Sequence, residues 1–575
     1  MRSSTGQLSE CFGRPGWVLL ALMFVCAPLA AYEGAGKDAS PRAARVLGEI
    51  DFPTSAQSSE AQQAFIRGLL LLHLFEYPFA REAFLKAQEL EPGFAMAYWG
   101  EAMTFNQPIW DQQDLAAGRT ALLKLGATAA IRQAATDDSR ERDFLASLEV
   151  LYGEGGKAER DRTYLLALER MASRYPDDHE VQLFYSLALM GVHAGVRDIP
   201  TYMQSTAVSE SVFCANPRHP GAAHYLIHGV DDPEHAALGL AAARALAAMA
   251  PDAGHSLHMT SHIFTALGMW NDVVSANENA LRVANAMRGE HGEAPQHWGH
   301  YTFWLLYGYL QQGRFDDARE LLSGAYRELQ AANPPPGDRM ILDPDESQVG
   351  SVVQMWARYL IETRDWNSDL ADWDFRLGDA FDPKLNFSYV QALRAAQGGQ
   401  AVLVTRYYDQ FNRLKDELGR LIRLQQEPQP MHLLYLDRLA VMERQLLAAV
   451  EIARGDTLTA ARIAGEAAEL ENAMPYSFGP PFVDWPAAEM QGELLLEGRR
   501  YADAARVFER QLQRTRMRSR TLLGLARAQE NLGEEGDAAW ALARLEAIWS
   551  QADPTVRASL AASADDPADG QPDTP

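Results

Sequence analysis

The sequence predicts an all-α protein in which pairs of antiparallel helices stack into a solenoid. Three observations support this fold class. Ala-rich segments carry apolar residues at helical spacing through most of the 575 residues, patterns typical of β-strands are nearly absent, and related segments recur with a period of 34 residues. In such an array each pair buries its apolar faces against its neighbours, so a chain of this length needs no division into three or four separate cores.

The chain begins with a segment that we expect to be an export signal. Two arginines precede or adjoin an uncharged apolar run over residues 17–31, and small residues at Ala30 and Ala31 mark the expected cleavage site. The run is short for a bilayer span, and an N-terminal anchor that is never cleaved is the alternative. We therefore expect residues 1–31 to be removed, residues 32–58 to form a flexible linker, and the mature protein to be periplasmic or secreted without stable membrane insertion.

The clearest repeat unit covers residues 61–92. Gly68 lies in its first helix, Ala80 and Phe84 lie in its second, and Pro92 ends it. Small side chains at Gly68 and Ala80 let the two helices approach closely, and Phe84 fills the space between them. Further units along the chain follow the same arrangement, around the glycines Gly268, Gly313, Gly455, Gly498 and Gly533.

These units resemble the tetratricopeptide repeat (TPR), a helix pair of 34 residues. The resemblance extends from about Glu60 to about Ser550, and roughly the first 330 residues also resemble exported bacterial TPR proteins of uncharacterised function. It implies a superhelical array whose first helices line a concave groove. TPR arrays serve many roles, so the resemblance assigns no active site.

Two Pro-rich segments interrupt the array, because proline cannot continue a helix. Loops inserted at these places could cap or fill the groove. The end of the chain is acidic, rich in proline and without periodicity, which predicts a disordered tail. The expected organisation is an N-terminal block at 59–332, a Pro-rich loop at 333–347, a middle block at 348–473, a second Pro-rich loop at 474–486, a C-terminal pair at 487–550 and the tail at 551–575.

The charge balance and the motif search exclude several functions. With 52 Lys and Arg against 77 Asp and Glu, the net charge is −25, which argues against nucleic acid as a partner. We find no phosphate-binding loop, nucleophile elbow or dinucleotide fingerprint, and neither HxxxH segment has the glutamate of a zinc protease after its first histidine. We therefore assign no catalytic residue and expect binding rather than catalysis.

The histidines are the most specific feature of the sequence. Of the 14 histidines in the chain, 11 lie in the segment from His193 to His300. His224 and His228 are four residues apart, and His258 and His262 repeat this spacing 34 residues later. Residues i and i+4 share one face of a helix, so both pairs should point the same way from neighbouring first helices into the groove. His219, His255 and His300 lie close enough in the sequence to extend this set.

Two functions fit this pattern, and a purely structural histidine network is the third reading. The first is an exported scaffold that binds a protein or peptide in a concave groove lined by histidines and aromatic residues. The alternative is a metal-binding protein or metal-dependent enzyme. Its four paired histidines would hold one ion or two, of Zn, Cu, Ni or Fe, if their nitrogens converge to about 2.0–2.2 Å from one point. The candidate carboxylates for that site are Asp231, Asp232 and Glu234.

Overall fold

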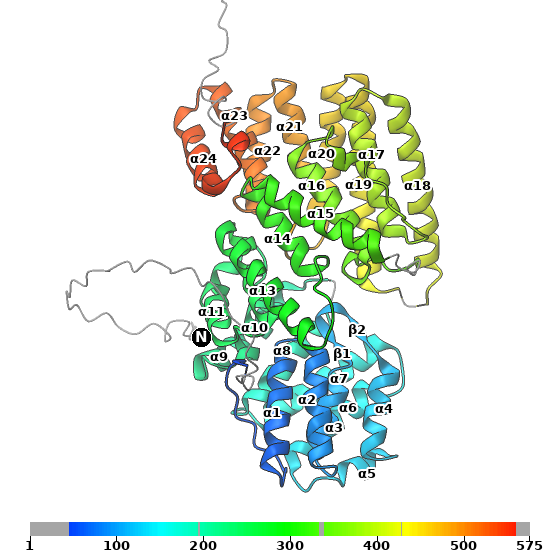
Figure 1. The fold of residues 1–575 in the computed structure, drawn as a ribbon, viewed down its shortest axis with the longest axis vertical. Helices are drawn as coiled ribbons and strands as arrows, with labels where there is room; N and C mark the ends of the chain where they lie inside the picture. Colours follow the sequence, from blue (N-terminus) through cyan, green and yellow to red (C-terminus); the bar gives the residue numbers. More distant parts are fainter. Residues whose placement is uncertain (1–44, 194–195, 333–338, 427, 559–575) are drawn as a thin grey trace, which may run out of the picture.

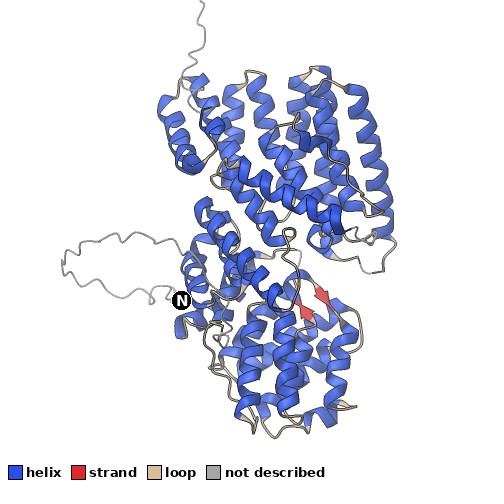
Figure 2. Cartoon of the chain, in the orientation of Figure 1, coloured by secondary structure: helices blue, strands red, loops and turns tan. Residues whose placement is uncertain are grey.

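The computed structural model describes residues 45–193, 196–332, 339–426 and 428–558. In these residues the protein is an all-α array of helix pairs, which confirms the predicted fold class (Figures 1 and 2). Two buried clusters of apolar residues divide the array into an N-terminal lobe, α1 to α13, and a C-terminal lobe, α14 to η4. Within the described residues, no helix is long and apolar enough to span a membrane.

The elements of the N-terminal lobe are α1 (Ser59–His73), α2 (Tyr77–Leu90), α3 (Ala95–Met103), β1 (Asn106–Gln107), η1 (Pro108–Trp110), β2 (Gln112–Gln113), α4 (Leu115–Leu125), α5 (Ala129–Gln133), α6 (Ser139–Leu151), α7 (Lys157–Arg174), α8 (His179–Gly191), α9 (Ile199–Ala215), α10 (Pro220–Gly229), α11 (Ala236–Met249), α12 (Gly254–Leu267) and α13 (Trp270–Glu290). The short strands β1 and β2 pair antiparallel, with Asn106 opposite Gln113.

The elements of the C-terminal lobe are α14 (His300–Gln311), α15 (Phe315–Ala332), η2 (Pro344–Glu346), α16 (Gln348–Thr363), η3 (Asp369–Asp372), α17 (Phe381–Gln397), α18 (Ala401–Arg423), α19 (Pro430–Arg454), α20 (Thr457–Ala473), α21 (Ala487–Glu497), α22 (Tyr501–Arg514), α23 (Ser519–Leu532), α24 (Glu535–Ile548) and η4 (Trp549–Gln551).

The helix pairs pack as the repeat pattern predicts. A Cβ atom added to Gly68 would lie 2.7 Å from the Phe84 ring, and one added to Gly100 in the next pair would lie 2.3 Å from the same ring. Phe84 is therefore in contact with two successive first helices across positions that admit no side chain. Phe508 repeats this contact between Gly492 and Gly524 near the other end of the array.

Each lobe curves until an early helix meets a late one. In the N-terminal lobe α1 packs against α10. In the C-terminal lobe the backbone N–H of Ser519 at the start of α23 donates to Gln311 of α14 (3.0 Å), and Arg518 donates to the Tyr307 hydroxyl (3.1 Å). This curvature brings the inner faces of the first helices together, so the side chains there are buried rather than displayed on an open groove.

Three of the predicted boundaries differ from the structure. The Pro-rich segment at 333–347 does not separate two cores, because α14 and α15 before it and α16 after it share one buried apolar cluster. Residues 45–58, expected to be a flexible linker, are packed, with Phe52 buried against Phe65 and Phe144. The described start of the predicted tail is also ordered, because Ala552 and Val556 are buried in an apolar cluster with Trp549.

The predicted export signal and its cleavage site at Ala30 and Ala31 lie outside the described residues.

Candidate metal centre

The two predicted histidine pairs lie on α10 and α12, which pack against each other in the N-terminal lobe. The Nε2 atoms of His224 and His228 are 3.1 Å apart, and those of His258 and His262 are also 3.1 Å apart. All four residues are buried. The i, i+4 spacing therefore places each pair of rings side by side, as the sequence predicts.

A third histidine completes each pair. One ring nitrogen from each of His224, His228 and His255 lies within 4.8 Å of the others, and we name this group trio A. His258, His262 and His300 form trio B by the same criterion. The four paired histidines thus do not share one point, because neighbouring helices lie about 8–10 Å apart. His255, one turn before His258, and His300, at the start of α14, complete the trios instead.

In trio B each ring donates its outer nitrogen to an acceptor. His262 Nδ1 donates to Asp231 Oδ2 (2.5 Å), and His300 Nδ1 donates to Asp345 Oδ2 (2.6 Å). His258 Nδ1 donates to Asn277 Oδ1 (2.7 Å). The amide of Asn277 is oriented by its own donation to the Val273 carbonyl (2.9 Å), which leaves its oxygen facing the histidine. In its neutral form each of the three rings therefore carries its proton on Nδ1 and keeps a lone pair on Nε2.

Trio A is held in a related way. His224 Nδ1 donates to the backbone carbonyl of His73 (2.6 Å), so its Nε2 also keeps a lone pair. The Nε2 atom of His255 is buried and has no hydrogen-bond partner among the described residues. The His73 ring is fixed in turn by Tyr225 and Glu180, at 2.9 and 2.6 Å.

Burial keeps most of these imidazoles neutral. It lowers the pKa of His224 to about 3 and places the pKa values of His228, His255 and His258 well below the ordinary value. For His300 burial acts in the same direction, but the Asp345 carboxylate outweighs it and the pKa is raised. Neutral imidazole is the form that binds a metal ion.

Aromatic rings surround the two trios and keep the centre dry. The Phe75 ring lies 4.3 Å from that of His224, and the Trp304 ring lies 4.3 Å from that of His262. Phe478 covers His262 from the segment 474–486, and Asp345 reaches His300 from the segment 333–347. Both Pro-rich insertions therefore contact trio B. The His300 side chain remains 28% exposed, which marks the most open edge of the centre.

The remaining predicted residues have other contacts. Asp232 pairs with Arg197 (2.9 Å) and with His235, and Glu234 is exposed, so neither carboxylate faces the trios. His219 caps α10 by accepting from the Ala222 N–H.

His219 also joins a second cluster, in which it and His73 both hydrogen-bond to Glu180. Those two bonds use the Glu180 carboxylate and favour its charged form, which holds its pKa well below the usual range although burial opposes this. We therefore interpret this cluster as a support for trio A rather than as a further metal site.

Sequence reasoning missed Asp345, Asn277 and Phe75. Asp345 belongs to an acidic stretch, DPDES, that is most simply interpreted as a solvated loop, and Asn277 lies in an ordinary helical pattern. No local signal connects either residue to a histidine 45 or 19 positions away.

The comparisons with known proteins identify no family. The sequence matches no protein-family model and no curated protein. Similar solved structures include the APC/C hetero-tetramer Cut9–Hcn1, at 11% identity over 88% of this chain and 76% of that one, with a TM-score of 0.32. Human IFIT1, solved as a dimer with m7Gppp-AAAA, is 12% identical over 86% of this chain and 96% of that one, with a TM-score of 0.33. Yeast Tom70 is 12% identical over 84% of this chain and 90% of that one, with a TM-score of 0.28. Similarity at this level leaves the function to be inferred from the site itself.

Proposed function

We propose that this protein binds transition-metal ions at trio A and trio B. The observation that carries the proposal is in trio B, where the Nε2 atoms of His258 and His262 lie 3.1 Å apart while both Nδ1 atoms donate to fixed acceptors. Two lone pairs at this distance repel each other unless a proton or a metal ion lies between them, and a metal ion binds both rings while each Nδ1 keeps its hydrogen bond. Carboxylate and amide acceptors behind the rings are also the usual support of metal-binding histidines.

The distances match those of a metal site. Two nitrogen ligands at about 2.0–2.1 Å from a tetrahedral ion are about 3.3 Å apart, close to the separation within each pair. The Nε2 atom of His255 is buried without a partner among the described residues, which costs about 1–3 kcal/mol, and ion binding removes this cost. The two trios are therefore nearly organised for binding before an ion arrives.

The ligand set favours a particular class of ion. Imidazole suits Zn, Cu, Ni and Fe, whereas Mg and Ca prefer oxygen ligands. Three protein ligands also leave the fourth position of a tetrahedral ion open to a small exogenous molecule, as in metal sites that carry out chemistry.

Metal analysis of the full-length chain tests the proposal. We expect up to two ions per chain in the wild type and a loss of most of them in a His224→Ala/His258→Ala variant, which removes one ligand from each trio. His291→Ala is the matched control, because His291 lies outside both trios and is exposed. Equal metal content in all three proteins would refute the proposal. If circular dichroism shows that the double variant is unfolded, metal titration of the wild type decides, and no uptake would be refuting.

We also propose that the protein is exported and binds a protein or peptide partner. The buried histidines do not support a histidine-lined groove, so the partner would contact the outer surface. Apolar side chains exposed where α18 is followed by α19 favour this, among them Leu424, which is 81% exposed, and Leu433. A Leu424→Asp/Leu433→Asp variant should lose a partner that copurifies with the wild type, and retention of that partner would contradict this surface. Fractionation of cells expressing the full chain tests export.

A further inference from the structure

We propose that trio A and trio B hold a coupled pair of copper ions, and that the pair binds dioxygen between them. This inference rests on the proposed function, because it requires both trios to be occupied.

The two trios are direct neighbours. The ring centroids of His228 in trio A and His262 in trio B are 6.0 Å apart, and those of His255 and His258 are also 6.0 Å apart. The first contact joins α10 to α12, and the second lies within α12, where His255 and His258 are one turn apart, so trio A and trio B adjoin each other. Ions in paired metal sites lie about 3.5–4 Å apart, a separation that a single small ligand can bridge.

The charges around the trios favour two monovalent ions. Asp231 and Asp345 hydrogen-bond to rings of trio B, and each has a second carboxylate oxygen that is buried without a partner in the described part of the chain. Arg197 and Asp232 neutralise each other nearby. Glu76 also accepts from the His255 backbone. Two Cu(I) ions need less compensating negative charge than two divalent ions in a dry site, and Asp231 and Asp345 alone would balance them.

The same balance between the charges of the ions and those of the aspartates favours dioxygen as the bridging ligand. Each Cu(I) ion gives one electron to O2, which is reduced by two electrons to peroxide and bridges two Cu(II) ions. No proton and no further reductant is needed for this step. The ions gain two positive charges and the peroxide brings two negative charges, so the net charge of the buried centre does not change. Copper also binds most tightly to imidazole sites among the divalent ions of its row.

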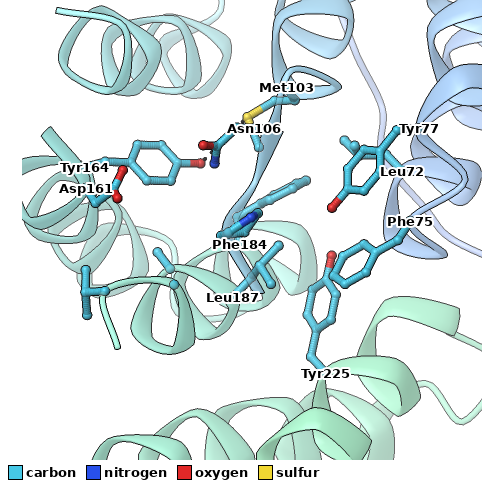
Figure 3. A pocket seen from close by; sticks show the side chains of 14 residues that line it. Leu72, Phe75, Tyr77, Met103, Asn106, Asp161, Tyr164, Phe184, Leu187 and Tyr225 are labelled. Carbon is cyan, nitrogen blue, oxygen red and sulfur yellow. Dashed lines mark hydrogen bonds between the residues drawn. The ribbon is translucent and has the colours of Figure 1, made fainter. Parts of the chain in front are cut away.

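A mostly apolar pocket lies beside trio A and gives a neutral diatomic molecule a route as far as Phe75. The empty space of this pocket, its open mouth included, is about 500 Å³, and Phe75 forms part of its wall. Figure 3 shows Phe75 with Tyr77 and Tyr225 on one side of this pocket and Tyr164 on the other. The Phe75 ring therefore separates the pocket from His224, 4.3 Å away. Phe75 holds a left-handed backbone conformation, φ 57°, which non-glycine residues rarely adopt unless the surrounding structure imposes it.

The test loads the full-length chain with Cu(I) under anaerobic conditions and then admits O2. We expect two copper ions per chain, uptake of one O2 for each pair, a new charge-transfer absorption band, and no electron paramagnetic resonance signal because the two Cu(II) ions are coupled. His300→Ala, which removes a ligand from trio B only, should lower O2 uptake at least tenfold while trio A still binds copper. His291→Ala should behave as the wild type.

Each outcome separates the two proposals. Two bound copper ions with no O2 uptake, or with the resonance signal of two independent Cu(II) ions, would overturn this inference and leave metal binding intact. Wild-type O2 uptake in His300→Ala would also overturn it. A chain that binds no copper and no other transition metal would refute the proposed function as well.

Discussion

Replacement of Asp231 by asparagine tests how the protein tunes its metal centre. Asp231 is buried, and its Oδ2 accepts from His262 Nδ1 at 2.5 Å. Asp231→Asn keeps the size of the side chain and an oxygen that can accept the same hydrogen bond. It removes one negative charge behind the ring. The variant therefore isolates the electrostatic contribution of this carboxylate to metal binding.

The expected magnitude follows from the geometry. The hydrogen bond, the width of the imidazole ring and a metal–nitrogen bond of about 2 Å together place the carboxylate roughly 6 Å from the ion. At an effective dielectric constant of about 20, opposite unit charges at that distance attract by about 3 kcal/mol. A monovalent ion should thus bind roughly 100-fold more weakly to the variant, at the upper end of the 10–100-fold losses usual for such supporting residues.

Competition titration with a chromophoric chelator measures this affinity, with circular dichroism to confirm folding. Asp382→Asn is the matched control, because Asp382 is a buried carboxylate of the C-terminal lobe that accepts from the Tyr435 hydroxyl (2.8 Å) instead of a trio ring. It should change metal affinity less than twofold, even if it lowers stability. Equal affinity in Asp231→Asn and the wild type would refute the assigned role, and so would equal losses in the two variants.

The remaining predictions concern stability. Metal at 100 times its dissociation constant should stabilise the folded chain by about 2.7 kcal/mol per site, seen as a higher melting temperature that a chelator reverses; no shift would contradict binding. Gly68→Ala should lower the free energy of unfolding by about 1–3 kcal/mol, because its Cβ would lie 2.7 Å from the Phe84 ring. Gly93→Ala is the control and should not lower it, because a Cβ added there would have no described atom within 4 Å. Urea titrations of the two variants measure the difference. Burial acts to raise the pKa of Glu489, but Arg518 outweighs burial and lowers it from 4.5 to about 2. This lowered pKa stabilises the folded state by about 3 kcal/mol above pH 4.5, and that stabilisation is lost as the pH falls toward 2. Glu489→Gln should lose this pH dependence of the free energy of unfolding and be less stable than the wild type at pH 7. An unchanged pH profile of stability in the variant would contradict the assignment.

The helical repeat and the histidine pairs could be predicted because their signals are local. Phe84 with Gly68 is a contact between adjacent helices, and a helix-pair period fixes it within one repeat. The pairing of His224 with His228 depends only on the 3.6-residue turn of the helix. Each of these predictions needed no knowledge of how the array curves.

The partners of those histidines depend on contacts between distant segments. Asp345 approaches His300 from a Pro-rich insertion, and Phe75 reaches His224 because α1 packs against α10. The sequence placed His255 and His300 near the site but gave no reason to assign them to different trios. It also placed the pairs in an open groove, whereas the closed curvature of the lobe buries them.

The sequence by itself determined the all-α repeat architecture and the two matched pairs of histidines. Both follow from periodicities that operate within one or two helices. Only the tertiary structure decided that six histidines form two trios, that aspartates stand behind trio B, and that the centre is buried. The physical reason is that superhelical curvature is the sum of small rotations over many repeats, and no single repeat specifies where the array closes on itself.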